Sequence, residues 1–233
     1  MFIPLHDDNP LENIPRQYVT WGLIAANVLA FVFFQGAMTG GVGYAAVVEY
    51  GLTPNSVPGF DPIPDSGAEL HDLLTFITYS FLHADVIHLG GNMLFLWVFG
   101  DNVEDAMGHL RFLVFYLLCT FFAGVAHEVM LPTSGVPLIG ASGAVAGIIA
   151  AYLMLHPHVR VWVLALGRIP LRLSAMWVLG AWAVLQVVNL MLAGPDTDVG
   201  WWAHIGGLIA GAVLVVVLRR PGVPLFDRPV EVR

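Results

Sequence analysis

The feature that most constrains this chain is a series of six apolar segments, each close to the length that crosses a lipid bilayer. A spanning helix needs roughly 20 predominantly apolar residues. Of the 233 residues, 58% are hydrophobic and only 11% are charged, which leaves too little polar surface to cover a water-soluble fold. We therefore predict an all-α, polytopic membrane protein with a six-helix bundle. The expected spans are Tyr18–Gln35, Asp85–Val103, His109–Met130, Leu138–His156, Leu173–Ala193 and Trp201–Leu218.

The chain is expected to form a single membrane domain over residues 1–233. A short N-terminal segment, 1–17, precedes the membrane core, 18–218, and a C-terminal tail, 219–233, follows it. The chain opens with acidic residues where a secretory signal peptide carries basic ones, so we expect the first apolar run to be a retained helix. The apolar stretch Val161–Leu166 is too short to cross the bilayer. Arginines surround it, which is typical of an interfacial hairpin.

The basic residues indicate how the bundle is oriented. All nine Lys and Arg positions are arginine, and with six spans all nine fall on one side. The loops on the other side, Gly36–Ala84, Leu131–Pro137 and Gly194–Gly200, contain none. Because cytoplasmic loops of membrane proteins are enriched in basic residues, we expect both termini in the cytoplasm. The second, fourth and sixth spans then begin on the outer side. No basic run interleaves with aromatics, so nucleic-acid binding is not supported.

Polar side chains within the expected membrane depth gather near the outer ends of three spans. His88 and Asn92, four residues apart, share one face of the second span. Ser142 lies near the start of the fourth span and His204 near the start of the sixth. Since these three spans run in the same direction, the four side chains are expected at similar depth. Polar groups in the membrane are costly and usually functional, so these four residues are site candidates.

Glycine spacing indicates which of these spans touch. Small residues four positions apart allow helix backbones to approach closely in lipid. If the two glycine faces meet, the Ser142 hydroxyl can be activated by the neutral imidazole of His204, as nucleophilic catalysis requires. No Asp or Glu in the spans is placed to orient His204, so we expect a dyad. The two glycine pairs are Gly143 with Gly147, and Gly207 with Gly211.

Acyl transfer also needs donors aimed at the negative charge that develops on the substrate carbonyl oxygen. His88 and Asn92 are the candidates, because they share one face at the depth of Ser142. We group Gly140, in the segment just before Ser142, with this oxyanion and substrate-binding region, and the backbone N–H of Ser142 could add a further donor.

With these motifs the chain resembles the bacterial rhomboid proteases over nearly its whole length. The three central motifs are His88 with Asn92, Gly140–Gly143 and Ala203–Gly211, and the flanking stretches Ile3–Pro10, Gly91–Glu104 and Trp177–Gln186 agree. Gly-x-Ser-Gly alone would be a weak signal, whereas the combination is highly specific.

The resemblance implies an intramembrane serine protease of the bacterial inner membrane. It implies Ser142 as nucleophile, His204 as general base, and His88 with Asn92 at the oxyanion site. The expected substrates are single-pass or other transmembrane proteins in the lipid bilayer, cleaved near the outer ends of their helices. Glu104 matches a position where a carboxylate ties loops at the cytoplasmic end of the second span. Ala146 occupies a position where many members carry an aromatic ring that packs on the histidine.

Other functions remain open from the sequence alone. A metal-dependent membrane protease could use His83, His88 and His204, but the chain has no His-Glu-x-x-His motif and no carboxylate near them. We therefore expect no metal and no cofactor. A catalytically inactive rhomboid-like protein that binds membrane helices is the main alternative, and the presence of both Ser142 and His204 argues against it. A transporter is disfavoured, because the spans show no inverted repeat.

Overall fold

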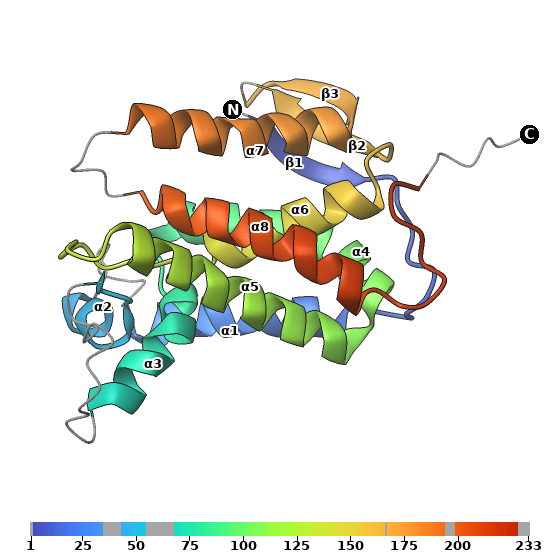
Figure 1. Ribbon diagram of the computed structural model, residues 1–233. Coiled ribbons are helices and arrows are strands. Elements are labelled where there is room, and N and C mark those ends of the chain that lie inside the picture. The colour runs from blue at the N-terminus through green and yellow to red at the C-terminus, as the bar shows by residue number, and fades with distance from the viewer. Residues whose placement is uncertain (1, 35–42, 55–67, 166, 194–198, 228–233) are drawn as a thin grey trace, which may run out of the picture.

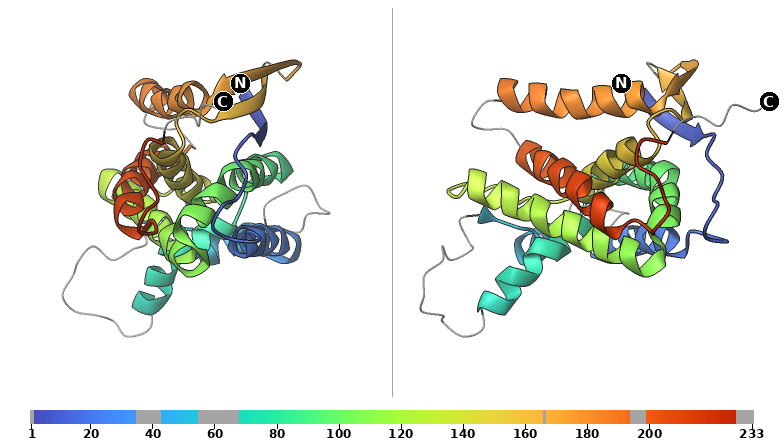
Figure 2. Two further views of the ribbon diagram at one scale, coloured as in Figure 1. Left: turned by 90° about the vertical axis from the view of Figure 1, so that its right-hand side faces the viewer. Right: turned by 45° about the vertical axis from the view of Figure 1, so that its right-hand side comes forward.

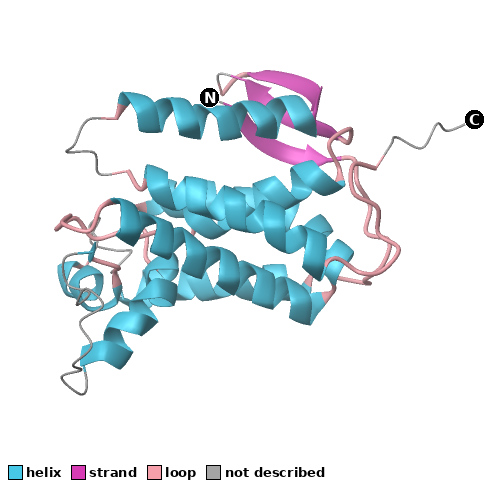
Figure 3. Ribbon diagram, viewed as in Figure 1, coloured by secondary structure: helices cyan, strands magenta, loops and turns pink. Residues whose placement is uncertain are grey.

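The computed structural model describes residues 2–34, 43–54, 68–165, 167–193 and 199–227. Several parts of the sequence lie outside these residues: Gln35 of the first expected span, much of the segments Gly36–Ala84 and Gly194–Gly200, and the last two arginines. The described part is mostly helical with one small sheet (Figures 1 and 3), which confirms the all-α class in its main feature. The elements are β1 (Phe2–Asp7), α1 (Tyr18–Phe34), α2 (Tyr44–Tyr50), α3 (Ala68–Thr78), η2 (Tyr79–Phe81), α4 (Val86–Met107), α5 (His109–Met130), α6 (Ser142–Leu155), β2 (Arg160–Ala165), β3 (Ile169–Ser174), α7 (Ala175–Leu192) and α8 (Trp201–Leu218).

Each expected span corresponds to one helix: α1, α4, α5, α6, α7 or α8. Helix α4 ends at Met107, four residues beyond the expected end at Val103. By length and composition, α5, α7 and α8 can each cross a membrane. The pair Leu70–Phe81 and Val86–Met107, bent by 85°, would form a fourth span if it is counted as one. Helices α1 and α6 are apolar but shorter. The chain is therefore a membrane protein by these helices, whereas the count of six spans stays a prediction.

Helix α6 is shorter than expected because Leu138, at the expected start of the span, is extended and not helical. Leu138 forms an antiparallel bridge with Leu52, so the helix begins at Ser142 and has 14 residues. At 1.5 Å per residue it is about 21 Å long, less than the roughly 30 Å of a hydrocarbon core. Its side chains are nearly all buried among α4, α5, α7 and α8 (Figure 2). Because its neighbours surround it, α6 does not need the length of a lipid-facing helix.

The helices alternate in direction, and this alternation places the arginines together. Figure 1 shows α6 and α8 running one way and α5 and α7 the other. Every described arginine flanks the end where α5 and α7 begin and where α6 and α8 finish; these are Arg16, Arg111, Arg160, Arg168, Arg172, Arg219 and Arg220. We call this the arginine end. Ser142 and His204 lie at the opposite end, at the starts of α6 and α8.

A three-stranded antiparallel sheet with the order β1-β2-β3 lies beside the start of α7 (Figure 1). Strands β2 and β3 pair as the hairpin that was expected around Val161–Leu166. Leu166 lies outside the described residues, and the interfacial location of the hairpin stays a prediction. Strand β1 was not predicted, because its partner β2 lies more than 150 residues away in the sequence. In β2, Val161, Val163 and Ala165 are buried while Trp162 is exposed, so the sheet covers the bundle with one face.

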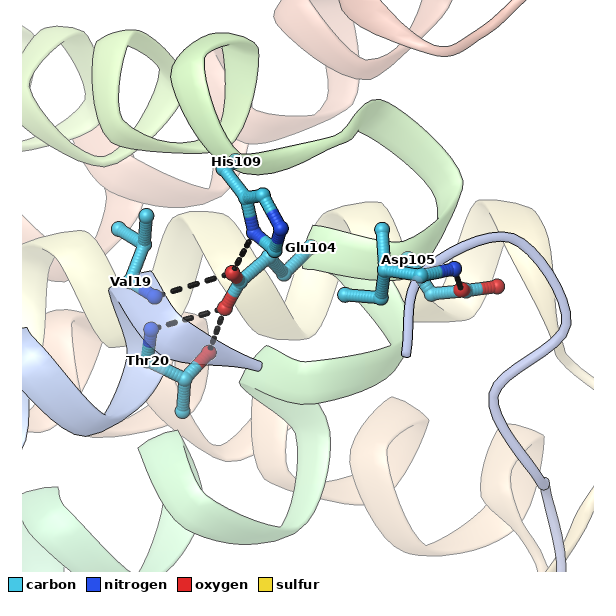
Figure 4. A network of polar contacts seen from close by, with 6 residues as sticks. Val19, Thr20, Glu104, Asp105 and His109 are labelled. Carbon is cyan, nitrogen blue, oxygen red and sulfur yellow. Dashed lines mark hydrogen bonds and ion pairs between the residues drawn. The ribbon is translucent and has the colours of Figure 1, made fainter. Parts of the chain in front are cut away.

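Glu104, near the end of α4, is fully buried and joins three helices at the arginine end (Figure 4). Its carboxylate accepts the backbone N–H groups of Val19 (3.0 Å) and Thr20 (2.8 Å) and the Thr20 hydroxyl (2.7 Å). Nδ1 of His109, at the start of α5, lies 2.5 Å from it. The carboxylate thus satisfies N–H groups in the first turn of α1 that have no partner inside that helix, and its charge suits this helix terminus.

Asp105, the next residue, fixes the segment that precedes α1 (Figure 4). It accepts the backbone N–H groups of Glu12 (3.1 Å), Asn13 (2.7 Å) and Ile14 (2.7 Å), and the Asn13 side chain adds a bond of 2.8 Å. Two adjacent carboxylates therefore hold the N-terminal segment against the end of α4.

Candidate active site

The two residues expected to form a dyad meet at the end opposite the arginines. Ser142 is the first residue of α6, and His204 lies in the first turn of α8. His204 Nε2 lies 2.8 Å from Ser142 Oγ, which is hydrogen-bonding distance. The imidazole is buried and the serine is half-buried. The hydroxyl and the ring are therefore placed for a proton to pass between them.

Close contact between the glycines of α6 and α8 brings these helices together. A Cβ atom on Gly207 would overlap the carbonyl oxygen of Gly143, and one on Gly211 would overlap that of Gly147. Only glycine allows such an approach without displacing one of the helices. Since Ser142 precedes Gly143, and His204 lies one turn before Gly207, this backbone contact sets the distance between hydroxyl and ring.

Gln186 of α7 is a third polar residue at this site, and the sequence analysis assigned it no role. Its Oε1 lies 2.9 Å from His204 Nδ1, and the residue is 5% exposed. The expectation of a two-residue site considered only Asp and Glu as orienting groups. The signal that could have found it is a glutamine within a mostly apolar span, and it lies in a stretch, Trp177–Gln186, that carries the family resemblance.

His88 is fixed with one ring nitrogen turned toward the segment before Ser142. The Ala84 backbone N–H donates to His88 Nδ1 at 3.3 Å, so the neutral ring carries its proton on Nε2. A Cβ atom on Gly140 would lie 2.8 Å from that Nε2. Gly140 has φ of +115°, a conformation that favours glycine. The missing side chain thus lets an N–H donor reach the backbone just before the serine.

Asn92 adds a second donor next to His88. Its Nδ2 is buried and has no hydrogen-bond partner within the described part of the chain. The Cβ position of Gly140 lies 3.7 Å from this nitrogen. Two side-chain N–H donors therefore converge on Gly140, beside Ser142, where a substrate carbonyl oxygen could accept from both.

Two tryptophan rings pack against His204. Trp182 of α7 has its ring centroid 6.0 Å from that of His204, and Trp201 of α8 lies 5.7 Å away in an edge-on arrangement. Ala146, the position expected from the resemblance to carry a ring in many members, is fully buried, 3.2 Å from the Cβ position of Gly207. The close helix contact leaves no space for a ring there, and the tryptophans contact the histidine instead.

The histidines of the metal-dependent alternative do not gather around one point. The His83 and His88 rings are 5.1 Å apart, but His204 is turned toward Ser142 and Gln186. Over the described ranges, no group of three or more His, Cys, Asp or Glu side chains is arranged to hold a metal ion.

Comparison with known proteins places this arrangement in a family. Residues 70–221, well over half of the chain, match the Rhomboid domain. The chain is 32% identical over 142 residues to the mitochondrial RHOMBOID-like protein 6 of Arabidopsis thaliana, covering 61% of this chain and 42% of that protein. It is 29% identical over 209 residues to the rhomboid protease GluP of Bacillus subtilis, covering 90% of this chain and 36% of that protein. It is 23% identical over 185 residues to the rhomboid protease GlpG of Serratia proteamaculans, covering 77% of this chain and 62% of that protein.

The chain therefore spans less than half the length of the first two of these relatives. The match to the Rhomboid domain covers α4 to α8 and with them Ser142, His204, His88, Asn92 and Gln186. This chain belongs to the Rhomboid family of membrane proteins.

Proposed function

We propose that this chain is an intramembrane serine endopeptidase that cleaves transmembrane or membrane-proximal segments of other membrane proteins. The observation that carries the proposal is the 2.8 Å separation of Ser142 Oγ and His204 Nε2. Two relatives described as rhomboid proteases support it. A serine beside an imidazole, with N–H donors close by, is the arrangement that acyl transfer requires.

In the proposed reaction, Ser142 Oγ attacks the scissile carbonyl carbon while His204 Nε2 takes the serine proton. The carbonyl oxygen gains negative charge and accepts N–H donors from His88 and Asn92. When the carbon–nitrogen bond breaks, His204 gives its proton to the leaving amine and an acyl ester remains on Ser142. A water molecule then gives a proton to His204 and attacks the ester carbon. The bond to Ser142 Oγ breaks, His204 returns its proton to that oxygen, and the carboxylic acid leaves. Water is the only co-reactant.

The proposed location is a bacterial inner membrane, with both termini in the cytoplasm and the site opening to the outer side. The gathering of arginines at one end supports this orientation. Substrate helices would reach the site laterally beside α7, which lies at the edge of the bundle in Figures 1 and 2. Four of its residues are buried, Ala175, Val178, Leu179 and Gln186, so much of its surface faces outward.

The proposal is tested with the purified protein in liposomes and a reporter that contains one transmembrane segment. We expect cleavage that a fluorophosphonate blocks and that the metal chelator EDTA leaves unchanged, because the proposed nucleophile is a serine hydroxyl. Cleavage blocked by EDTA and resistant to fluorophosphonate would support the metal-dependent alternative. A folded protein that binds the reporter but neither cleaves it nor reacts with fluorophosphonate would be an inactive helix-binding protein.

The oxyanion donors give a graded prediction. Replacing Asn92 or His88 with alanine is expected to lower kcat by about 100-fold with little change in KM, because each donor acts mainly on the charge of the transition state. The measurement is steady-state cleavage of the reporter, corrected for the folded fraction.

Asn102, on the same helix, supplies the matched control for Asn92. Its side chain donates to the Asn9 carbonyl oxygen at 2.9 Å, at the arginine end. Asn102→Ala is expected to reduce thermal stability while kcat per folded molecule stays within about twofold. Wild-type kcat in both the Asn92 and His88 variants would remove these residues from the mechanism.

A further inference from the structure

Gln186 lies in the one half of α7 that otherwise has no buried side chain. The other buried residues of α7, Ala175, Val178 and Leu179, all belong to its first five positions. Backbone bonds from Ala175 to Val159 (2.8 Å) and from Met176 to Pro157 (2.9 Å) also hold that first turn. A buried carboxamide in an apolar helix loses its hydration and needs specific partners, so its position requires an explanation.

The hydrogen bonds of Gln186 determine which way its amide faces. Nε2 lies 2.9 Å from the carbonyl oxygen of Trp182, and a carbonyl oxygen only accepts. The amide nitrogen must therefore face Trp182, which leaves Oε1 facing His204 Nδ1 at 2.9 Å. The reversed amide would place two oxygens against each other at Trp182, so the network fixes the assignment.

This orientation of the amide selects one tautomer of the histidine. Because Gln186 Oε1 can only accept, Nδ1 of His204 must carry a proton. In the neutral ring Nε2 then holds a lone pair, and Nε2 is the atom 2.8 Å from Ser142 Oγ. The other tautomer would point an N–H group at the serine and could not take its proton.

We propose that Gln186 is the positioning residue of this site: it holds His204 in the tautomer and orientation that accept the Ser142 proton, and it does so only while α7 lies against α8. This inference rests on the proposed function. A carboxylate would orient the ring equally well, but it would add a buried negative charge to a helix that faces lipid. The neutral amide supplies the acceptor without that charge, and its oxygen also stabilises the imidazolium that forms during the reaction.

The dependence on α7 follows from where that helix is buried. Its first turn is held by backbone bonds, whereas the second half contacts the site through Gln186, one turn after the Trp182 ring that also packs on His204. Movement of this half away from α8 would withdraw the acceptor from Nδ1. The state of the dyad is therefore linked to the position of α7.

The test compares Gln186→Leu, Gln186→Glu and Asn189→Leu. Leucine removes the acceptor at similar size, glutamate restores an acceptor, and Asn189→Leu removes a carboxamide one turn further along the same helix. We expect Gln186→Leu to lower the rate of fluorophosphonate labelling by about 10- to 100-fold, the range found when a metal-ligating histidine loses the partner that orients its ring. Gln186→Glu is expected to stay within about fivefold of the wild-type rate, and Asn189→Leu within about twofold.

A spectroscopic readout separates positioning from a merely structural role. With ¹⁵N-labelled histidine, the wild-type His204 signal, identified by its loss in His204→Ala, is expected to show one tautomer with the proton on Nδ1. In Gln186→Leu we expect both tautomers, while thermal unfolding shows that the protein remains folded. Wild-type labelling together with an unchanged tautomer in Gln186→Leu would overturn the inference.

The outcomes also distinguish this inference from the proposed function. If the wild type labels at Ser142 and cleaves the reporter, but Gln186→Leu behaves identically, only the role of Gln186 fails. If the folded wild type neither labels nor cleaves, the proposed function fails first.

Discussion

Replacing Ser142 with alanine is expected to abolish both fluorophosphonate labelling and reporter cleavage, lowering kcat by at least about four orders of magnitude. The substitution removes the atom that forms the acyl ester and leaves His204 without the hydroxyl 2.8 Å away. His204→Ala is expected to have a similar effect on cleavage, because the serine hydroxyl is a weak nucleophile without a base. The double variant should be no worse than either single one, since the two residues act as a unit.

Ser134→Ala is the matched control for this prediction. Ser134 lies in the loop before α6, at the same end of the bundle, where its hydroxyl accepts the Val136 backbone N–H at 3.2 Å. Its replacement is expected to leave labelling and cleavage at wild-type rates. Labelling that persists in Ser142→Ala would place the reactive serine elsewhere and would contradict the proposed site.

A single methyl group at Gly207 is expected to destabilise the bundle by about 3 kcal/mol or more, at the upper end of overpacking effects. The added Cβ would overlap the Gly143 carbonyl oxygen, and it would lie 2.9 Å from the carbonyl carbon and 3.2 Å from Ala146 Cβ. No rotamer change relieves a collision with backbone, so α6 and α8 must separate. Because the same contact sets the distance between Ser142 and His204, we also expect kcat per folded molecule to fall by about 100-fold.

Gly22→Ala is the control, because its expected effect on stability is zero or opposite to that of Gly207→Ala. A Cβ at Gly22, within α1, would meet no atom within 4 Å. Alanine there should leave stability unchanged or raise it by up to about 1 kcal/mol through helix propensity. Unfolding in detergent, followed by tryptophan fluorescence, measures both variants. A Gly207→Ala protein as stable as the wild type would show that the two helices do not touch through backbone.

Apolar length predicted the helices well wherever one helix occupies the whole run. Helices α5 and α8 have the predicted bounds, because their apolar residues begin and end with the helix. The start of α6 was placed four residues too early, since Leu138 is apolar but bonds to Leu52 in an extended segment. A bridge between residues so far apart leaves no periodic pattern in the sequence.

The part of the candidate site that depends only on helix direction could be predicted from the sequence. Parallel spans were expected to bring Ser142 and His204 to one depth, and the structure places them within hydrogen-bonding distance. The contact between Gln186 and His204 depends instead on how α7 is rotated about its own axis, which an apolar helix does not reveal by hydropathy. The same holds for Trp182, whose packing on His204 depends on that rotation.

Glu104 and Asp105 also constrain the order in which the protein can be assembled. Their hydrogen bonds reach back 84 to 93 positions along the chain, to residues between Glu12 and Thr20. During synthesis, the first turn of α1 and the segment before it therefore wait for partners made much later. Until α4 has been made, N–H groups in that turn have no partner within their own helix and depend on water. Helices α1 and α4 consequently reach their final state as a pair, although a long segment of chain separates them.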